Sequence, residues 1–302
     1  MTAPEKRVVL IGGKGQVAMS LARELPNRGF DVTILARPDY DLIRTAEISD
    51  AIVAAKPTVV INPAAYTAVD RAEDEAATAF AINRDGAAAI SSAAAKAGAA
   101  IIHFSTDYVF DGRKTTPYRE DDTTDPQSVY GASKLAGEVA VAAANPRHVI
   151  LRTAWVCSPD CANFLKTMLR LAAERPELRV VDDQRGSPTF AGDIAEITAQ
   201  IAGVVATTPA GAPQFGVFHL ASAGETSWCD FARTIMAVSK DNGGPHVPVH
   251  AITTADFPTK VRRPAYSKLD TAKLARVYGI EVADWESGLR KCLDGMMNAQ
   301  RA

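Results

Sequence analysis

The chain has 302 residues, of which 47% are hydrophobic, and this is enough apolar material for one large α/β domain with a smaller appendage. Its net charge of −2 gives no electrostatic basis for binding nucleic acid or an anionic membrane. No apolar run reaches the roughly 18 residues that a membrane-spanning helix needs, and residues 1–7 lack the apolar stretch of a signal peptide. We therefore expect a cytoplasmic protein with a small-molecule partner.

The cysteines and histidines give no pattern that is typical of a metal site. Cys157 and Cys161 are four residues apart, but no matching pair of cysteines or histidines occurs elsewhere in the chain. We expect reduced thiols and no bound metal.

A nucleotide-binding pattern opens the chain. Residues 7–11 read as a buried parallel strand, and Gly12-x-x-Gly15-x-x-Ala18 leads directly from this strand into a helical pattern. Glycines let a backbone approach a pyrophosphate closely, and a helix N-terminus offers it unpaired N–H groups. A glycine turn alone is common, but its place between strand and helix favours a dinucleotide. The candidate cofactor residues here are Gly12, Gly15, Gln16 and Val17.

The end of the next expected strand, residues 31–36, indicates which cofactor is accepted. An acidic residue at this point would bind the ribose 2′-hydroxyl and repel a 2′-phosphate, whereas this chain has Arg37. This favours NADPH, with NADH still possible, and the alternative is a solvated arginine. Asp41 and Leu42 are expected beside the adenine ring.

Two further strands are expected at residues 58–61 and 100–104, with a long alanine-rich helix at residues 76–98 between them. Small residues after the first strand leave room for a cofactor at the carboxyl edge of the sheet. Asn83, a poor helix former, is either a surface residue or a tie to a neighbouring strand. The cofactor candidates at these strand ends are Ala64, Ala65, Tyr66 and Ser105.

The central feature is Tyr130-x-x-x-Lys134 at the start of an expected helix. Residues four apart share a helix face, so the phenol and the ammonium can approach the same point. A nearby cation is expected to lower the pKa of Tyr130 toward neutral pH and make it a proton donor. Thr106, which ends the strand before it, can hydrogen-bond a substrate carbonyl. Residues 111–127, between the two, are expected to form a mobile flap.

Strands and helices alternate over the rest of the chain. Strands are expected at residues 148–153, 178–181 and 217–220, and helices at 163–174, 190–205, 228–239 and 284–297. This order predicts a Rossmann-like, doubly wound parallel sheet with a smaller C-terminal α/β lobe. We assign residues 1–157, with about 184–220 returning to them, to an NAD(P)-binding domain. Residues of about 158–183 and 221–302 form the expected sugar-nucleotide domain.

These motifs, in this order, resemble those of the extended short-chain dehydrogenases/reductases. Within that superfamily, the chain is similar over nearly its whole length to the dTDP-4-dehydrorhamnose reductases. The resemblance rests on residues 62–70 (NPAAYTAVD), 105–110 (STDYVF), 152–156 (RTAWV) and 183–189 (DQRGSPT) and on Arg263-Pro264.

The resemblance implies reduction of the C4 ketone of a dTDP-linked 4-dehydro-6-deoxy sugar by NAD(P)H. Tyr130 would protonate the developing alkoxide, Lys134 would hold the nicotinamide ribose, and Thr106 would donate a hydrogen bond to the oxyanion. The implied substrate residues are Thr67, Val69, Thr106, Asp107, Tyr108, Trp155, Asn163, Gln184 and Arg263.

One departure concerns a metal. Similar reductases can hold a magnesium ion between two subunits with glutamates, and this chain has Ser20 and Gly192 at the matching places. Neither side chain supplies a carboxylate, so we expect a monomer or a weak homodimer without a bridging metal.

Two alternatives remain. A dehydratase would carry Asp-Glu after the threonine, whereas this chain has Asp107-Tyr108, but an epimerase that retains NAD stays open. Relatives of the fold also serve as non-catalytic regulatory subunits of methionine adenosyltransferase. Such a role would not require the tyrosine and lysine, both of which are present.

Overall fold

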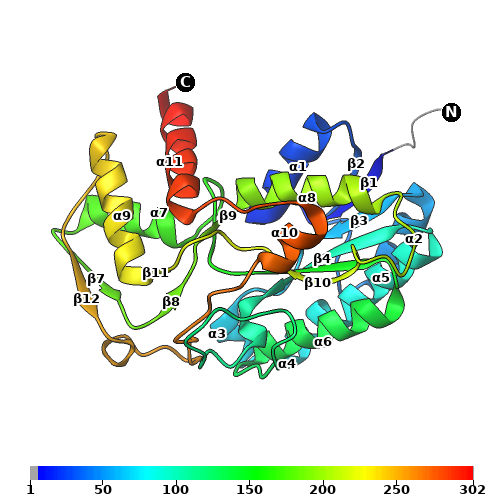
Figure 1. Ribbon diagram of the computed structural model, residues 1–302, viewed down its shortest axis with the longest axis horizontal. Helices are drawn as coiled ribbons and strands as arrows, with labels where there is room; N and C mark the ends of the chain where they lie inside the picture. The colour runs from blue at the N-terminus through cyan, green and yellow to red at the C-terminus, as the bar shows by residue number, and fades with distance from the viewer. Residues whose placement is uncertain (1–5, 302) are drawn as a thin grey trace.

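The protein, described here from a computed structural model over residues 6–301, is built on a six-stranded sheet (Figure 1). The strand order is β10-β5-β4-β3-β1-β2, and every neighbouring pair is parallel. The strands are β1 (Arg7–Ile11), β2 (Asp31–Leu35), β3 (Val59–Asn62), β4 (Ala100–Thr106), β5 (His148–Thr153) and β10 (Gly216–His219). The winding reverses between β1 and β3, so a ligand crevice is expected at the carboxyl ends of these two strands.

Helices cover both faces of the sheet (Figure 1). On one face, α1 (Gln16–Asn27) and α8 (Ala191–Val205) bury Leu21 and Ile201 against the strands. On the other, α2 (Thr45–Ala55), α5 (Ala87–Lys96) and α6 (Val129–Ala144) bury Ile52, Ile90 and Val141. Strands buried on both faces read as continuous apolar runs, as the sequence of β1 does. The predicted doubly wound fold is confirmed.

The predicted helix over residues 76–98 is present, but it is not α-helical throughout. The segment begins as α4 (Ala76–Phe80), widens into a π-helix (Ala81–Gly86), and continues as α5. The wide turn presses the carbonyl of Asn83 against α6, where a Cβ at Gly137 would collide with it. π turns of this kind occur frequently at functional sites.

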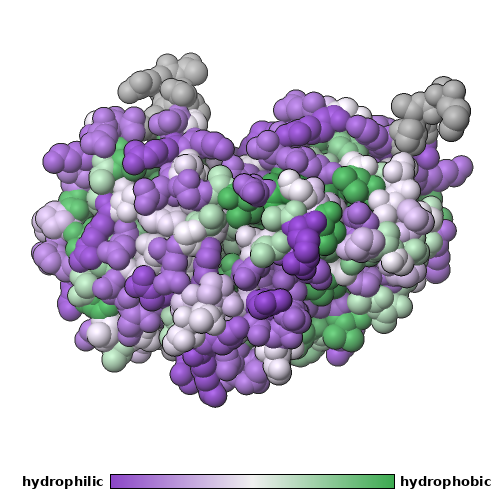
Figure 2. All heavy atoms as spheres, in the orientation of Figure 1, coloured by the Kyte–Doolittle hydropathy of each residue, from purple (hydrophilic) through white to green (hydrophobic). Residues whose placement is uncertain are grey.

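A second lobe has its own apolar core. The pair of parallel strands β7 (Leu178–Val181) and β12 (Val249–Ile252) packs with α7 (Phe164–Glu174), α9 (Trp228–Asp241) and α11 (Trp285–Arg301). The remaining short elements are α3 (Val69–Ala72), β6 (Val156–Cys157), β8 (Arg185–Gly186), β9 (Thr189–Phe190), β11 (Thr226–Ser227), α10 (Ala272–Tyr278) and 3-10 turns at Asp107–Val109 and Thr254–Asp256. Figure 2 shows a mostly polar face with a notch between the two lobes. Within residues 6–301, no helix has the length and apolar character to cross a bilayer.

The segment 111–127, expected as a flap, is tied to the C-terminal part of the chain. Tyr118, 2% exposed, stacks on Phe110 and receives a backbone bond from Asp270, while its own N–H donates to the carbonyl of Lys268. The polar composition of the segment did not reveal that the buried ring of Tyr118 anchors it.

Candidate active site

The turn after β1 lies at the reversal point of the sheet. Gly12 has a φ of +88°, and a Cβ there would lie 3.2 Å from the Cβ of Ala64, which follows β3. A non-glycine residue would therefore be strained and crowded. The two cofactor candidates Gly12 and Ala64 meet where the crevice is expected.

Gly15 begins α1 in a different setting. A Cβ there would meet no atom within 4 Å, and the helix has no side-chain cap and no acidic residue in its first turn. Its first N–H groups are thus available to an anion, and the space beside Gly15 suits a pyrophosphate. The residues present fit the dinucleotide implied by the sequence.

The side chains of Gln16 and Val17, which follow Gly15, make contacts within the protein. Gln16 donates to the carbonyl of Val156 and accepts from Ser158 and from Asn163, at 2.9 Å each. Asn163 also caps α7 by accepting from the N–H of Lys166. Val17 packs into the core. Gln16 and Asn163 therefore join the glycine turn to the second lobe, a contact that the sequence did not reveal.

The end of β2 is open to solvent. Arg37 is exposed just past the strand, and Asp41 accepts a hydrogen bond from the N–H of Ile43 at 3.1 Å. Leu42 packs against the core and against Gly86 of the π-helix. The arginine side chain is accessible to a ligand here, as a residue that recognises the 2′-phosphate must be.

Asn83 turns out to be a tie. It is 1% exposed, accepts from the N–H of Tyr66 at 2.8 Å, and donates to the carbonyl of Tyr66 and to Ser133 of α6. The hydroxyl of Tyr66 donates to Glu75. Asn83 thereby holds the loop after β3 to the helix that carries Tyr130. Ala65 lies in this loop, Thr67 is exposed beyond it, and Val69 starts α3.

The end of β4 carries a buried hydroxyl and carboxyl. Thr106 donates to Oδ1 of Asp107 at 2.9 Å and accepts from the N–H of Tyr108. Burial raises the pKa of Asp107 to about 7, with the bond from Thr106 opposing this rise. Oδ2 of Asp107 and the hydroxyl of Ser105 are buried and make no hydrogen bond, although Ser267 lies near enough to Asp107 to lower its pKa. Such groups are poised to take up a polar ligand.

Helix α6 is pressed onto this strand end. Ser128 caps the helix by accepting from the N–H of Gly131, where any Cβ would collide with the carbonyl of Tyr108. The close approach places the rings of Tyr130 and Tyr108 edge to face, 5.5 Å apart. It brings the hydroxyl of Tyr130 close to the hydroxyl of Thr106.

The protonation of the tyrosine differs from the prediction. Burial raises the pKa of Tyr130 above its usual value of 10.0, and the nearby hydroxyl of Thr106 only partly opposes this. Lys134 is 2% exposed, donates to the carbonyl of Phe104 at 2.6 Å, and has its own pKa lowered by burial to about 8. The expected lowering of the tyrosine pKa by Lys134 is therefore wrong, because desolvation dominates and the nearby Asp107 and Tyr108 raise the pKa further.

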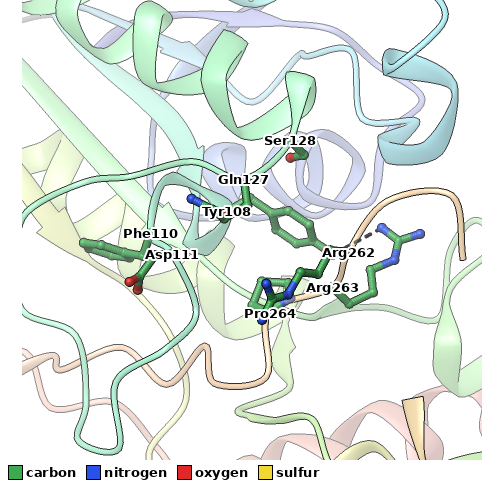
Figure 3. Close-up of a pocket in the computed structure, with 8 residues that line it drawn as sticks. All are labelled: Tyr108, Phe110, Asp111, Gln127, Ser128, Arg262, Arg263 and Pro264. Carbon is green, nitrogen blue, oxygen red and sulfur yellow. Dashed lines mark hydrogen bonds between the residues drawn. The ribbon is translucent and has the colours of Figure 1, made fainter. Parts of the chain in front are cut away.

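A small cavity lies beside these residues (Figure 3). Arg263 points toward the hydroxyl of Tyr108, to which it donates at 3.3 Å, and it pairs with Asp70. This places one predicted substrate residue from the C-terminal part of the chain against another from the end of β4. The cavity is lined by Tyr108, Phe110, Asp111, Gln127, Ser128, Arg262, Arg263 and Pro264.

The remaining substrate candidates lie on the second lobe or at its junction with the sheet. Trp155 has a φ of +49° and stacks on Trp228 with ring centroids 3.6 Å apart. A bulky residue with positive φ is uncommon and often marks a functional site. Gln184 donates to Thr254 at 3.0 Å.

Nothing in the described part of the chain gathers three or more His, Cys, Asp or Glu residues that could hold a metal. Ser20 is buried and accepts from Arg23, and a Cβ at Gly192 would meet no atom within 4 Å. The absence of a bridging metal stays a prediction.

The groups around Lys134 were not predicted from the sequence. His103 is 3.4 Å from its ammonium nitrogen, Asn62 bonds to His103, and Glu138 forms a buried ion pair with Arg152. One signal in the sequence could have indicated them. His103 interrupts the apolar run of β4, and a buried polar group needs hydrogen-bond partners.

Comparison with known proteins agrees with this geometry. Residues 6–298 match the family described as RmlD substrate binding domain. A dTDP-4-dehydrorhamnose reductase from Sinorhizobium fredii is 46% identical over 286 residues, 94% of this chain and 96% of that protein.

Two solved structures are similar over the same extent. The dTDP-4-dehydrorhamnose reductase of Clostridium acetobutylicum has a TM-score of 0.90 and 35% identity, covering 96% of this chain and 99% of that one. The enzyme of Bacillus anthracis, solved in complex with NADP, has a TM-score of 0.89 and 32% identity with the same coverage. The chain therefore belongs to the dTDP-4-dehydrorhamnose reductase family.

Proposed function

We infer that this chain reduces the C4 ketone of dTDP-4-dehydro-6-deoxy-L-mannose to dTDP-L-rhamnose with a reduced nicotinamide cofactor. The observation that carries this inference is the meeting of Tyr130 and Thr106 at the carboxyl end of β4, one helical turn from buried Lys134. Family membership over nearly the whole chain supplies the substrate class.

The state of Tyr130 suits reduction. Because burial raises its pKa, the phenol keeps its proton at neutral pH and can give it to the carbonyl oxygen as negative charge develops there. The cofactor supplies the hydride that the carbonyl carbon accepts. Thr106 donates a hydrogen bond to the same oxygen once its own bond to Asp107 is released.

Protonation of Asp107 would permit that release. With a pKa of about 7, its carboxyl is partly protonated at neutral pH and can then donate to the hydroxyl of Thr106 rather than accept from it. The hydroxyl proton of Thr106 would then be available to the substrate.

We propose NADPH as the preferred cofactor. Arg37 is exposed at the end of β2, where a cation favours a 2′-phosphate over a free hydroxyl. A family member from Bacillus anthracis was solved with NADP, which supports this choice.

We propose that residues 1–157 and about 184–220 bind the cofactor and that the other lobe, about 158–183 and 221–302, binds the sugar nucleotide. Arg263 lies in the second lobe and Trp155 just before its first residue. Both suit the substrate, since a guanidinium can pair with a diphosphate and an aromatic face can cover a sugar or base. The proposed assembly is a monomer or a weak homodimer without a metal.

The direct test mixes the protein with NADPH and dTDP-4-dehydro-6-deoxy-L-mannose and follows the loss of NADPH absorbance. Stoichiometric oxidation with formation of dTDP-L-rhamnose is expected. No oxidation would contradict the proposal. Tightly retained NAD would then favour an epimerase, and co-purification with a methionine adenosyltransferase would favour a regulatory subunit.

A further inference from the structure

A chain of buried polar groups runs through the sheet beneath Lys134. His103 lies in β4 and pairs in register with Asn62 at the end of β3, and both are 1% exposed. Polar side chains in such an interior are stable only when they bond to one another. Their partners therefore define which atoms carry protons.

The carboxamide of Asn62 fixes the tautomer of His103. Oδ1 of Asn62 accepts from the N–H of Ala64 at 3.2 Å, so its amino group faces Nδ1 of His103 at 3.1 Å. Burial is the larger cause that lowers the pKa of His103 well below 6.5, so the ring is neutral whether or not Lys134 carries a charge. A neutral imidazole that accepts at Nδ1 carries its proton at Nε2.

That proton points at Lys134. Nε2 of His103 lies 3.4 Å from Nζ, which donates in turn to the carbonyl of Phe104 at 2.6 Å. An ammonium has no lone pair to accept an N–H donor, whereas a neutral amine has one. The imidazole thus faces Lys134 with the atom that favours the unprotonated lysine.

Other charged groups around Lys134 are accounted for. Glu138, one turn further along α6, raises the pKa of Lys134, but its carboxylate is held by Arg152 of β5 at 2.9 and 2.7 Å. The π-helix contributes Asn83, which is neutral and bonds to Ser133. Tyr130 retains its proton. Besides the neutral carbonyl of Phe104, His103 is therefore the group on β4 that contacts the amine, and it is the one that can titrate.

We propose that His103 is a positioning residue that holds Lys134 through its Nε2 proton and favours the neutral amine, with Asn62 fixing the tautomer. The same chain continues to Ala64, which packs beside Gly12 at the cofactor turn. It so links the nucleotide edge of the sheet with the lysine. The catalytic importance of this link rests on the proposed function, but its protonation pattern does not.

The test follows Lys134 by NMR in the ligand-free protein with ¹³C-labelled lysine, its signal assigned by loss in Lys134→Met. Wild-type Lys134 is expected to titrate near pH 8. In His103→Gln the carboxamide can turn its oxygen to the ammonium, so the midpoint is expected to rise by about one pH unit. His219→Gln is the matched control, because His219 is also fully buried in the sheet but bonds to the carbonyl of Asp270.

A rise in His103→Gln alone supports the proposal, whereas no rise, or an equal rise in both variants, overturns it. A second measurement needs no variant: imidazole ¹⁵N shifts of the wild type should show His103 protonated at Nε2, and protonation at Nδ1 overturns the proposal. Because neither readout requires turnover, a failure of the reductase assay remains distinguishable from a failure of this inference.

Discussion

Two regions at the same edge of the sheet solve different problems. In the reaction corner, formed by Thr106, Tyr130 and Lys134, the polar groups are packed closely together. Burial raises the pKa of Tyr130 and lowers that of Lys134. In the nucleotide edge, formed by Gly15 and Arg37, there is open space and an exposed cation. Proton transfer needs groups removed from water, whereas nucleotide binding needs backbone N–H groups with room beside them.

The largest expected effect is on turnover and comes from a substitution in the reaction corner alone. Tyr130→Phe removes the proton donor but keeps the ring, so turnover should fall by about 10³-fold or more while NADPH binding persists. Stopped-flow oxidation and fluorescence titration of NADPH measure the two quantities. Tyr278→Phe is the control, because that hydroxyl bonds to the carbonyl of Gln214 outside the site. Unchanged turnover in Tyr130→Phe would remove the phenol from the mechanism.

Gly15→Val addresses the nucleotide edge alone. The residue has φ −89° and ψ 155°, which valine adopts readily, and its Cβ would meet no protein atom within 4 Å. The free energy of unfolding should change by less than about 1 kcal/mol, yet affinity for NADPH should fall at least about tenfold, because the methyl groups occupy the pyrophosphate's space.

Gly12→Ala gives the contrast. Its φ of +88° and the 3.2 Å approach to Ala64 predict a loss of about 1–2 kcal/mol of stability as well as of affinity. Urea unfolding and calorimetric titration of both variants separate the two positions. Equal destabilisation of both would contradict the view that Gly15 serves the ligand and Gly12 serves the fold.

Arg37→Asp sharpens the comparison with a smaller effect. Exchange of the cation for a carboxylate should lower the NADPH over NADH ratio of kcat/KM by at least about tenfold, since one charged hydrogen bond contributes about 1.5–3 kcal/mol. Arg175→Asp, on the exposed end of α7, makes the same change in net charge and should leave the ratio as it is. An equal change in both variants would mean that net charge, and not a specific contact, reads the cofactor.

The nucleotide edge was largely predictable from sequence, because its features are local. A strand, a glycine turn and a helix follow one another within about twenty residues around Gly12 and Gly15. The spacing of Tyr130 and Lys134 was equally local. Periodicity therefore located the main groups of both regions.

The pKa values and the histidine tautomer in the reaction corner were not predictable from the sequence. Tyr130 is partly buried where α6 packs closely on the end of β4, and at this contact Gly131 lies against the carbonyl of Tyr108, a residue of a different element. Asn62 and His103 are paired in register on two neighbouring strands, and His103 contacts Lys134 of a helix. Desolvation and tautomers depend on such tertiary contacts, and spacing along one element does not contain them.

The smallest effect concerns Asp107 and stability. Its folded pKa of about 7 lies above the usual 3.8, so folding favours the protonated carboxyl. Its contribution is full below about pH 4 and is lost as the pH rises through about 7, at most about 4 kcal/mol in all. Asp107→Asn, which cannot ionise, should therefore be more stable than wild type at pH 8 by about 1–3 kcal/mol and nearly equal to it at pH 4.

Urea unfolding at both pH values measures this difference, and Asp284→Asn is the opposite control. Hydrogen bonds from Ser287 lower the pKa of Asp284, so the carboxylate stabilises the fold above its usual pKa, and that stability is lost as the pH falls through the lowered value. Asp284→Asn should thus weaken the protein at pH 8, where Asp107→Asn strengthens it. If Asp107→Asn were less stable than wild type at pH 8, the carboxylate would be satisfied in the fold, and the release of Thr106 by protonation would have no basis.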